Sequence, residues 1–198
     1  MGCIVCSKYT VQHPDRVEHL VLTSPAGVGN TPFVNTTPFQ NRVWDSGLLT
    51  PMDVIRWLGF IPGLCYSRHY GAARALRSPQ GSSFRTMDIV LFSDYSYFNY
   101  ALPASGERAI SLLLHADGRG KYPIIDILKG RIECPVSIVY GDQQYDWIKR
   151  FDGDILHEQL RAQGVECSIR ELPEAGHMLM LDNTAGFNTL IPELCRLR

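Results

Sequence analysis

Three short runs of apolar, β-prone residues constrain the fold of this chain more than any other feature of its sequence. They lie at residues 16–24, 135–140 and 165–172, and each run meets turn residues such as Pro, Gly and Asp. Runs of this length and composition predict buried strands. Helices are predicted over three further stretches, residues 1–13, 152–163 and 184–197. Because short buried strands that alternate with helices are typical of parallel α/β sheets, we expect three parallel strands with flanking helices.

A long segment, residues 25–133, separates the first predicted strand from the second. Its beginning, residues 25–50, is rich in Gly, Pro, Asn and Thr and predicts an irregular connection. The rest of the segment has mostly helical patterns. The chain therefore divides into an α/β core, formed by residues 1–24 and 134–198, and a mostly helical insertion.

Local signals predict where the helices of the insertion begin and end. Thr50 and Pro51 suit the N-cap and the first helical position, and Gly59 and Pro62 are expected to end that helix. Ser105 is expected to cap a later helix. The further helices are predicted over about 66–76, 86–99 and 105–116.

Composition excludes several classes of protein. With 19 basic and 20 acidic residues, the formal net charge is −1, which argues against a basic nucleic-acid-binding surface. No apolar run reaches the roughly 18 residues of a membrane-spanning helix. Cys3 and Cys6 form a CxxC pair without a second pair at zinc spacing, so we expect two small side chains packed on the sheet. We expect no metal, no cofactor and no nucleic-acid partner; acylation of Gly2 and Cys3 is the alternative meaning of the first residues.

Titratable residues follow two of the predicted strands. Asp142 and Asp146 come after the second strand, and His177 follows the third, in the turn Gly176-His177. Ligands of parallel α/β sheets gather at the carboxyl ends of the strands, where neighbouring loops meet. A carboxylate there can orient an imidazole, which then acts as a general base.

Three stretches of the chain resemble the α/β-hydrolases. Residues 9–25 (YTVQHPDRVEHLVLTSP) resemble the helix and strand that follow the nucleophile elbow of that superfamily. Residues 135–147 (PVSIVYGDQQYDW) resemble a late strand with the catalytic-acid loop. The tripeptide Ala-Gly-His at 175–177 resembles the catalytic-histidine loop. The resemblance implies the C-terminal half of an α/β-hydrolase with a helical lid over residues 25–133.

Within that superfamily the chain is similar to the lipid-acting branch of α/β-hydrolase-domain proteins 4 and 5. Ser-Gly-Glu-Arg-Ala at 105–109 resembles a lid motif of that branch, and Asp146-Trp147 resembles its acid loop. His177 and Asp182 fit its His-x4-Asp pattern, which is associated with acyl transfer to lysophospholipids. The resemblance implies lipid acyl hydrolysis or acyl transfer by Ser-His-Asp chemistry.

The resemblance also suggests roles for the two strand-end loops. His177 would accept and return the proton of the nucleophile, and Asp146 would orient His177. Related loops read Gly-Asp-x-Asp-Trp, so the residue before Trp147 is preferred as the acid. Asp142 is the alternative acid, or a turn residue that accepts a hydrogen bond from its own backbone.

The nucleophile of this chemistry is absent from the sequence. No Gly-x-Ser-x-Gly elbow precedes the first predicted strand. Counting back from His13-Pro14 by the usual length of this helix in the family places Met1 and Gly2 on the last two residues of the elbow. We therefore expect that the chain is the C-terminal part of a longer hydrolase, that the nucleophile precedes Met1, and that the chain alone is inactive.

The resemblance implies a lipid or acyl-ester substrate. Several aromatic residues of the insertion are expected to line an acyl pocket, to contact a membrane or lipid-droplet surface, or to form the insertion's own core: Trp44, Trp57, Phe60, Tyr95, Phe98 and Tyr100. The expected location is the cytoplasm, with a membrane or the mitochondrion as alternatives. The alternative function is a non-catalytic lipase co-activator or membrane-associated interaction protein, since some members of the branch replace the nucleophile.

Overall fold

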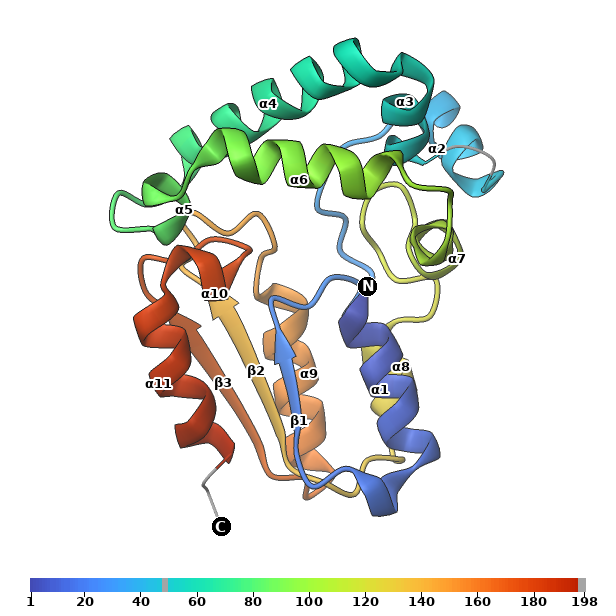
Figure 1. The fold of residues 1–198 in the computed structure, drawn as a ribbon. Coiled ribbons are helices and arrows are strands. Elements are labelled where there is room, and N and C mark those ends of the chain that lie inside the picture. Colours follow the sequence, from blue (N-terminus) through green and yellow to red (C-terminus); the bar gives the residue numbers. More distant parts are fainter. Residues whose placement is uncertain (48–49, 196–198) are drawn as a thin grey trace.

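A three-stranded parallel sheet forms the centre of the protein (Figure 1). The computed structural model describes residues 1–47 and 50–195. The strands are β1 (Leu20–Thr23), β2 (Val136–Gly141) and β3 (Cys167–Leu172), in the spatial order β1-β2-β3. The prediction of three parallel strands is therefore confirmed. The first strand starts later than residue 16, because the short helix η1 (Pro14–Arg16) occupies that position.

In the described part of the chain, five helices pack beside the sheet. They are α1 (Gly2–Gln12), α8 (Ile124–Leu128), α9 (Phe151–Ala162), α10 (Leu179–Asp182) and α11 (Thr184–Cys195). The structure confirms the predicted helices at the start of the chain, after β2 and at the end, although residues 196 and 197 of the last prediction lie outside the described residues. The helices α8 and α10 were not predicted, because four or five residues are too few for a periodic pattern.

The two faces of the sheet pack against different helices. One face carries Leu22, Ile138 and Tyr140, which share a buried cluster with side chains of α1, α8 and α9. The opposite face carries Val139 and Leu172, which pack with apolar side chains of α10 and α11. Because side chains alternate along each strand, the parallel register brings these residues into two continuous rows.

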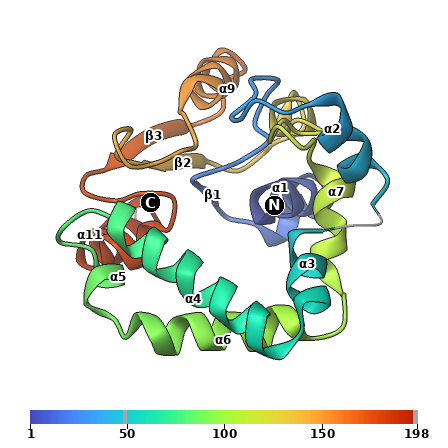
Figure 2. The same cartoon turned by 90° about the horizontal axis from the view of Figure 1, so that it is seen from above.

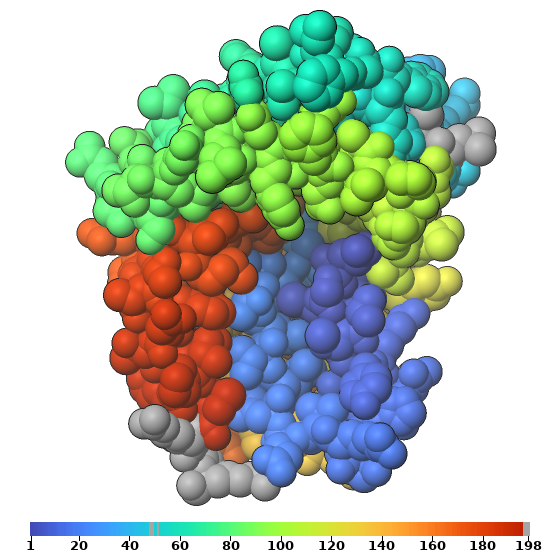
Figure 3. Space-filling model, viewed as in Figure 1, coloured from blue at the N-terminus to red at the C-terminus, as the bar shows by residue number. Residues whose placement is uncertain are grey.

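The insertion forms a helical cap across the carboxyl end of the sheet (Figures 1 and 2). Its elements are α2 (Pro38–Asp45), α3 (Pro51–Leu58), α4 (Phe60–Arg77), α5 (Ser83–Thr86), α6 (Ile89–Ala101), η2 (Gly106–Ala109) and α7 (Ile110–Leu113). The two longest, α4 and α6, pack side by side, and in the space-filling view the cap covers that end of the core (Figure 3).

Three expectations for the insertion were wrong in detail. The segment 25–50 contains α2, which starts with a capping box formed by Thr37 and Gln40. Pro62 does not end a helix but lies in the first turn of α4, where the missing N–H costs no hydrogen bond. Ser105 caps no helix with its side chain, and a 3-10 turn and α7 replace the helix expected over 105–116.

The cap helix over 51–58 follows its local signals. Thr50 is its N-cap, and a capping box joins Thr50 to Asp53. Gly59, with φ of 71°, ends the helix in a conformation that other residues rarely adopt. The predicted start and glycine end of this helix are confirmed.

Both ends of the insertion contribute to the core of the sheet. Val28 and Leu114 are buried in the same cluster as β1 and β2, together with Ile124 of α8. The division into core and insertion at residues 24 and 133 therefore stays a prediction. Within the described residues, no helix is long and apolar enough to cross a membrane.

Candidate active site at the carboxyl ends of the strands

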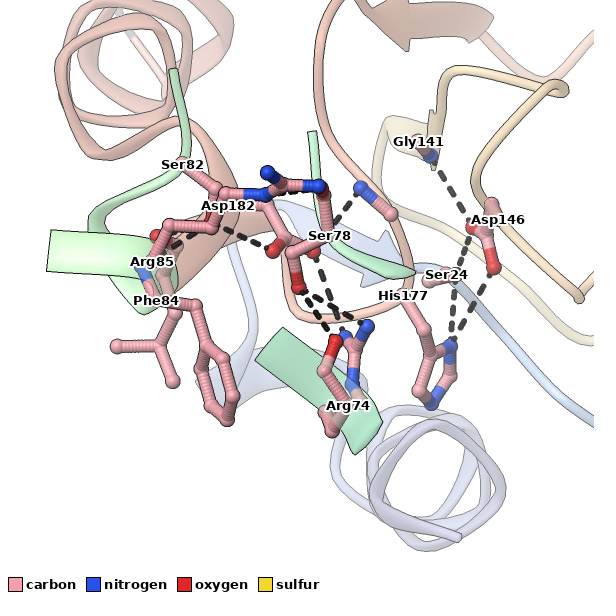
Figure 4. A network of polar contacts seen from close by, with 12 residues as sticks. Ser24, Arg74, Ser78, Ser82, Phe84, Arg85, Gly141, Asp146, His177 and Asp182 are labelled. Carbon is pink, nitrogen blue, oxygen red and sulfur yellow. Dashed lines mark hydrogen bonds and ion pairs between the residues drawn. The ribbon is translucent and has the colours of Figure 1, made fainter. Parts of the chain in front are cut away.

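Three side chains from three loops meet at the carboxyl end of the sheet (Figure 4). Ser24 directly follows β1, Asp146 lies in the loop after β2, and His177 lies in the loop after β3. The Nδ1 atom of His177 lies 3.0 Å from Oγ of Ser24 and 3.6 Å from Oδ1 of Asp146. The structure thus places Asp146 and His177 next to each other, as the strand-end argument expects, and adds Ser24 between them.

The direction of these hydrogen bonds determines which nitrogen of His177 carries a proton. The Ser24 hydroxyl has one proton, which it donates to Oδ2 of Asp146. Its oxygen can then only accept from His177, so Nδ1 of the neutral ring is protonated and Nε2 holds the lone pair. Since 3.6 Å is too long for a hydrogen bond, Ser24 is the bridge between the carboxylate and the imidazole.

The backbone of Ser24 is held in an uncommon conformation. Its φ is 40°, in the left-handed region that residues other than glycine rarely adopt. The side chain is buried, and the backbone N–H donates to the carbonyl of Val139 at 2.7 Å, one strand away. Such strain persists only where the surroundings determine it, and it is a feature of functional sites.

Asp146 is buried but well supplied with hydrogen bonds. It is 1% exposed, and its carboxylate accepts from the N–H groups of Gly141 at 3.2 Å and Ile148 at 2.9 Å. Burial by itself raises the pKa of Asp146, but the interaction with His177 and the hydrogen bonds from Ser24 and Ile148 outweigh it. The net effect lowers the pKa of Asp146, so the carboxylate is ionised at neutral pH.

Asp142 has a different environment. Its Oδ1 accepts from the backbone N–H of Gln144 at 2.9 Å, and its carbonyl accepts from the N–H groups of Tyr145 and Asp146. This is the pattern of a turn residue that organises its own loop. Of the two acids considered from the sequence, Asp146 is the one that contacts the histidine network.

The end of β2 packs directly on the histidine loop. A Cβ added at Gly141 would lie 2.5 Å from the carbonyl oxygens of both Ala175 and Gly176. No residue with a side chain fits there without displacing backbone. The glycine therefore allows the acid loop and the histidine loop to approach each other closely.

Asp182, the second residue of the His-x4-Asp pattern, binds the backbone of the histidine loop and two residues of the cap. Its buried carboxylate accepts from the N–H of Gly176 at 3.0 Å and from the Ser82 hydroxyl at 2.9 Å. It also forms an ion pair with Arg74 of α4 at 3.5 Å. These contacts bind the loop beside His177 to the cap, rather than placing the carboxylate on the imidazole ring.

A cavity of about 290 Å³ lies between the cap and the site. His177 is one of the residues that line it, and the Nδ1 side of its ring faces Ser24 and Asp146 (Figure 4). Trp147 packs against the ring of His177, with centroids 4.7 Å apart. The other residues in the lining come mostly from the cap: Ser67, Tyr70, Gly71, Arg74, Phe84, Phe92, Ser93, Ser96, Tyr100 and Met178.

The aromatic residues singled out in the insertion differ in position. Tyr100 is the only one of the six that lines the His177 cavity, within the described part of the chain. Trp57, Phe60, Tyr95 and Phe98 are more than half exposed on the cap. The half-buried Trp44 donates its indole N–H to the carbonyl of Leu114 at 2.8 Å. The cavity instead uses phenylalanines of α5 and α6, Phe84 and Phe92.

The first residues begin α1 at the end of the sheet where the strands terminate (Figure 1). Met1 is the N-cap of α1, and both Met1 and Gly2 are exposed. Cys3 is half-buried beside the carbonyl of Thr23, but Cys6 is exposed, so the expectation that both pack on the sheet was wrong for Cys6. Within residues 1–47 and 50–195, no group of three or more His, Cys, Asp or Glu side chains could hold a metal ion.

Two residues of the site were missed from the sequence. Ser24 stands at a strand end, immediately before Pro25, so the rule that drew attention to Asp146 and His177 could also have found it. Arg74 lies in the last turn of a cap helix, and no local pattern distinguishes it from the arginines around it. Only the packing of α4 over the histidine loop identifies it.

Comparisons with known proteins relate the chain to enzymes that act on lipids. No protein-family model matches the chain. It is 28% identical over 207 residues to a probable 1-acylglycerol-3-phosphate O-acyltransferase of rice (Oryza sativa), covering 98% of this chain and 48% of that protein. It is 26% identical over 208 residues to a human (lyso)-N-acylphosphatidylethanolamine lipase, covering 98% of this chain and 56% of the lipase. The chain thus spans about half the length of the curated relatives it matches.

Solved structures share the fold. An α/β-hydrolase enzyme, MGS-M2, from a Medee basin deep-sea metagenome library matches with a TM-score of 0.62 at 15% identity. The match covers 100% of this chain and 62% of that enzyme. The sheet and its helices therefore have the arrangement of an α/β-hydrolase over part of its length.

Proposed function

We propose that this chain carries the acid, the base and the cap of a lipid acyl hydrolase or acyltransferase. The chain has the α/β-hydrolase fold. Over nearly its whole length it is related to α/β-hydrolase-domain proteins 4 and 5 and to plant and yeast lipid acyltransferases. The substrate is a lipid carboxylic ester. The acceptor of the acyl group is water in a hydrolase or a lysophospholipid in an acyltransferase. Residues 25–133 form the lid over the core of residues 1–24 and 134–198.

The observation that carries the proposal is the bridge from Asp146 through Ser24 to Nδ1 of His177. An ionised, buried carboxylate at one end and a protonated Nδ1 at the other leave Nε2 as the base. The imidazolium that forms during catalysis is stabilised by the same carboxylate. His177 lines the cavity under the cap, where an acyl ester can meet Nε2.

Ser24 is not the nucleophile in this proposal. A triad needs the nucleophile at Nε2 and the acid at Nδ1, whereas Ser24 and Asp146 both face Nδ1. We assign the attack to a serine of a Gly-x-Ser-x-Gly elbow that ends at Met1-Gly2. The position of Met1 at the carboxyl end of the sheet supports this assignment, because the elbow of this fold lies at that end (Figure 1).

The proposal is tested first by the sequence that precedes Met1 in the reading frame. We expect Gly-x-Ser there, preceded by further strands. A protein that includes this segment should react with a fluorophosphonate probe, and His177→Ala should slow the reaction at least about a thousandfold. Asp142→Asn is the matched control, because the hydrogen bonds that Asp142 accepts come from Gln144, Tyr145 and Asp146 in its own loop, and it should leave labelling unchanged.

Other outcomes would contradict the proposal. Asn or Gly in place of the serine would favour the non-catalytic co-activator or interaction protein. A fast labelling reaction that persists in His177→Ala would show that His177 is not the base. The 198-residue chain alone should show no burst of acyl-enzyme with an activated ester, and a burst abolished by His177→Ala would show that the nucleophile lies within the chain.

A further inference from the structure

Arg74 places a cation in the wall of the His177 cavity. It belongs to the last turn of α4, and its side chain is 22% exposed. One turn earlier, Gly71 packs so closely on Ser93 of α6 that an added Cβ would collide with the serine hydroxyl. This close approach of α4 and α6 positions the following turn of α4 over the histidine loop.

The guanidinium is fixed in place, but its hydrogen-bonding capacity is not used up. Its Nη2 lies 3.5 Å from Oδ2 of Asp182, and its Nη1 donates to the Ser78 hydroxyl at 3.3 Å. Phe84 lies under its plane, 5.5 Å from ring centroid to guanidinium carbon. Both polar contacts are long for charge-assisted hydrogen bonds, and a guanidinium has five N–H donors. The fork therefore has donors available to an anion.

The neighbouring acid does not cancel this positive site. Asp182 already accepts short hydrogen bonds from Gly176 and Ser82, which share its charge. Among the described residues, those that line the cavity include no Asp or Glu, while Arg74 and His177 are both basic. The hydroxyls of Tyr70 and Tyr100 in the same lining can donate to an anion as well. An anion that enters the cavity thus meets a preoriented fork and, in the part of the wall formed by residues 1–47 and 50–195, no opposing carboxylate.

We propose that Arg74 is the subsite for a phosphate monoester, which holds an acyl donor or acceptor with its reacting oxygen towards His177. This inference rests on the proposed function, and it adds the headgroup class and the residue that selects it. A planar guanidinium pairs with two phosphate oxygens at once, which a lysine cannot do. The apolar part of the ligand would lie against Phe84, Phe92 and Trp147.

Binding to the 198-residue chain tests the subsite without turnover. Trp147 lines the cavity, so its fluorescence reports occupancy, and Trp147→Phe shows how much of the signal it supplies. The probes are 1-hexanoyl-glycerol 3-phosphate, neutral 1-hexanoyl-glycerol, glycerol 3-phosphate and inorganic phosphate. We expect the lysolipid phosphate to bind about tenfold tighter than the neutral lipid, as one charge-assisted pair would give. Tighter binding of the lysolipid phosphate than of inorganic phosphate would identify a lipid headgroup rather than free phosphate as the ligand.

Variants of two arginines on the same helix connect this preference to Arg74. Arg74→Gln should make the affinities for the charged and neutral lipids equal, and Arg74→Lys should retain only part of the preference. Arg77→Gln is the matched control, because Arg77 is exposed and lies outside the cavity lining. The proposal would be overturned if Arg77→Gln lost the preference for the charged lipid as fully as Arg74→Gln. It would also be overturned if Arg74→Gln kept that preference unchanged. Equal binding of both lipids by the unmodified chain would overturn it without any variant.

The test separates the subsite from the proposed function. The 198-residue chain could prefer the charged lipid while the protein that includes the segment before Met1 transfers no acyl group. That result would support the subsite and contradict the catalytic role. Acyl transfer with equal rates on charged and neutral lipids would support the catalytic role and contradict the subsite.

Discussion

Asp182 is expected to contribute more to stability than any exposed carboxylate of the chain. Its side chain has no exposed surface, and it binds Gly176, Ser82 and Arg74, which belong to the histidine loop and the cap. Asp182→Ala removes the acceptor of two hydrogen bonds and leaves a mostly buried guanidinium without its carboxylate. The substitution therefore weakens the histidine loop of the core and its contact with the cap at the same time.

The expected cost of Asp182→Ala is about 3 to 5 kcal/mol, the range for breaking a buried ion pair by removing one partner. Asp182→Asn keeps the shape and one acceptor, so we expect about half of that cost. Asp154→Ala is the control. Asp154 pairs with Arg150 at 2.8 Å, closer than the 3.5 Å of the Asp182 pair, but both side chains of this pair are about 40% exposed. That variant should cost at most about 0.5 kcal/mol, because solvent screens the pair.

Urea unfolding followed by tryptophan fluorescence measures these differences. For a chain of this size, about 3 kcal/mol should shift the midpoint by roughly 1 M or more, given an m-value of up to about 3 kcal/mol/M. A cost below about 1 kcal/mol for Asp182→Ala would refute the reasoning, since it would mean that Asp182 does not join the cap to the histidine loop. An equal cost for Asp154→Ala would refute the argument that burial, rather than distance, decides the strength of the pair.

Three further predictions concern the acids and the bridge. Asp146→Asn should lower the free energy of unfolding by about 2 kcal/mol, because it weakens charge-assisted hydrogen bonds to a buried group. Asp142→Asn should change the free energy of unfolding by less than about 0.5 kcal/mol. Equal costs of the two substitutions would contradict the assignment of Asp146 as the acid. Nitrogen NMR should find neutral His177 protonated at Nδ1, and Ser24→Ala should change the ratio of the two ring tautomers; an unchanged ratio would mean that Ser24 does not position the ring. The backbone N–H of Thr50 holds the pKa of Asp53 at about 2, below its ordinary 3.8, so this group stabilises the fold above pH 3.8 and the contribution is lost as the pH falls towards 2. Acid unfolding of Asp53→Asn should lack this dependence, and an unaltered acid profile would contradict it.

Much of the core follows from short-range patterns. The three strands, α1 and α9 were predictable because a few consecutive apolar residues, ended by Pro or Gly, specify them within a short window. The same reasoning placed Asp146 and His177 at strand ends, and parallel pairing then brought their loops together. Short helices such as α5, α8 and α10 were not predicted, because one turn of helix has too few residues to show a periodic pattern.

The sequence by itself determined the three strands, the longer helices that flank them and the two strand-end loops with titratable groups. Only the tertiary structure decided that Ser24 joins these loops, that Asp182 faces the cap, and that Arg74 faces the cavity. The partners in these contacts are far apart in the chain: 122 residues separate Ser24 from Asp146, and 100 separate Ser82 from Asp182. Periodicity, capping and turn signals act over a few residues, whereas contacts across such distances depend on how whole layers pack, which no local pattern encodes.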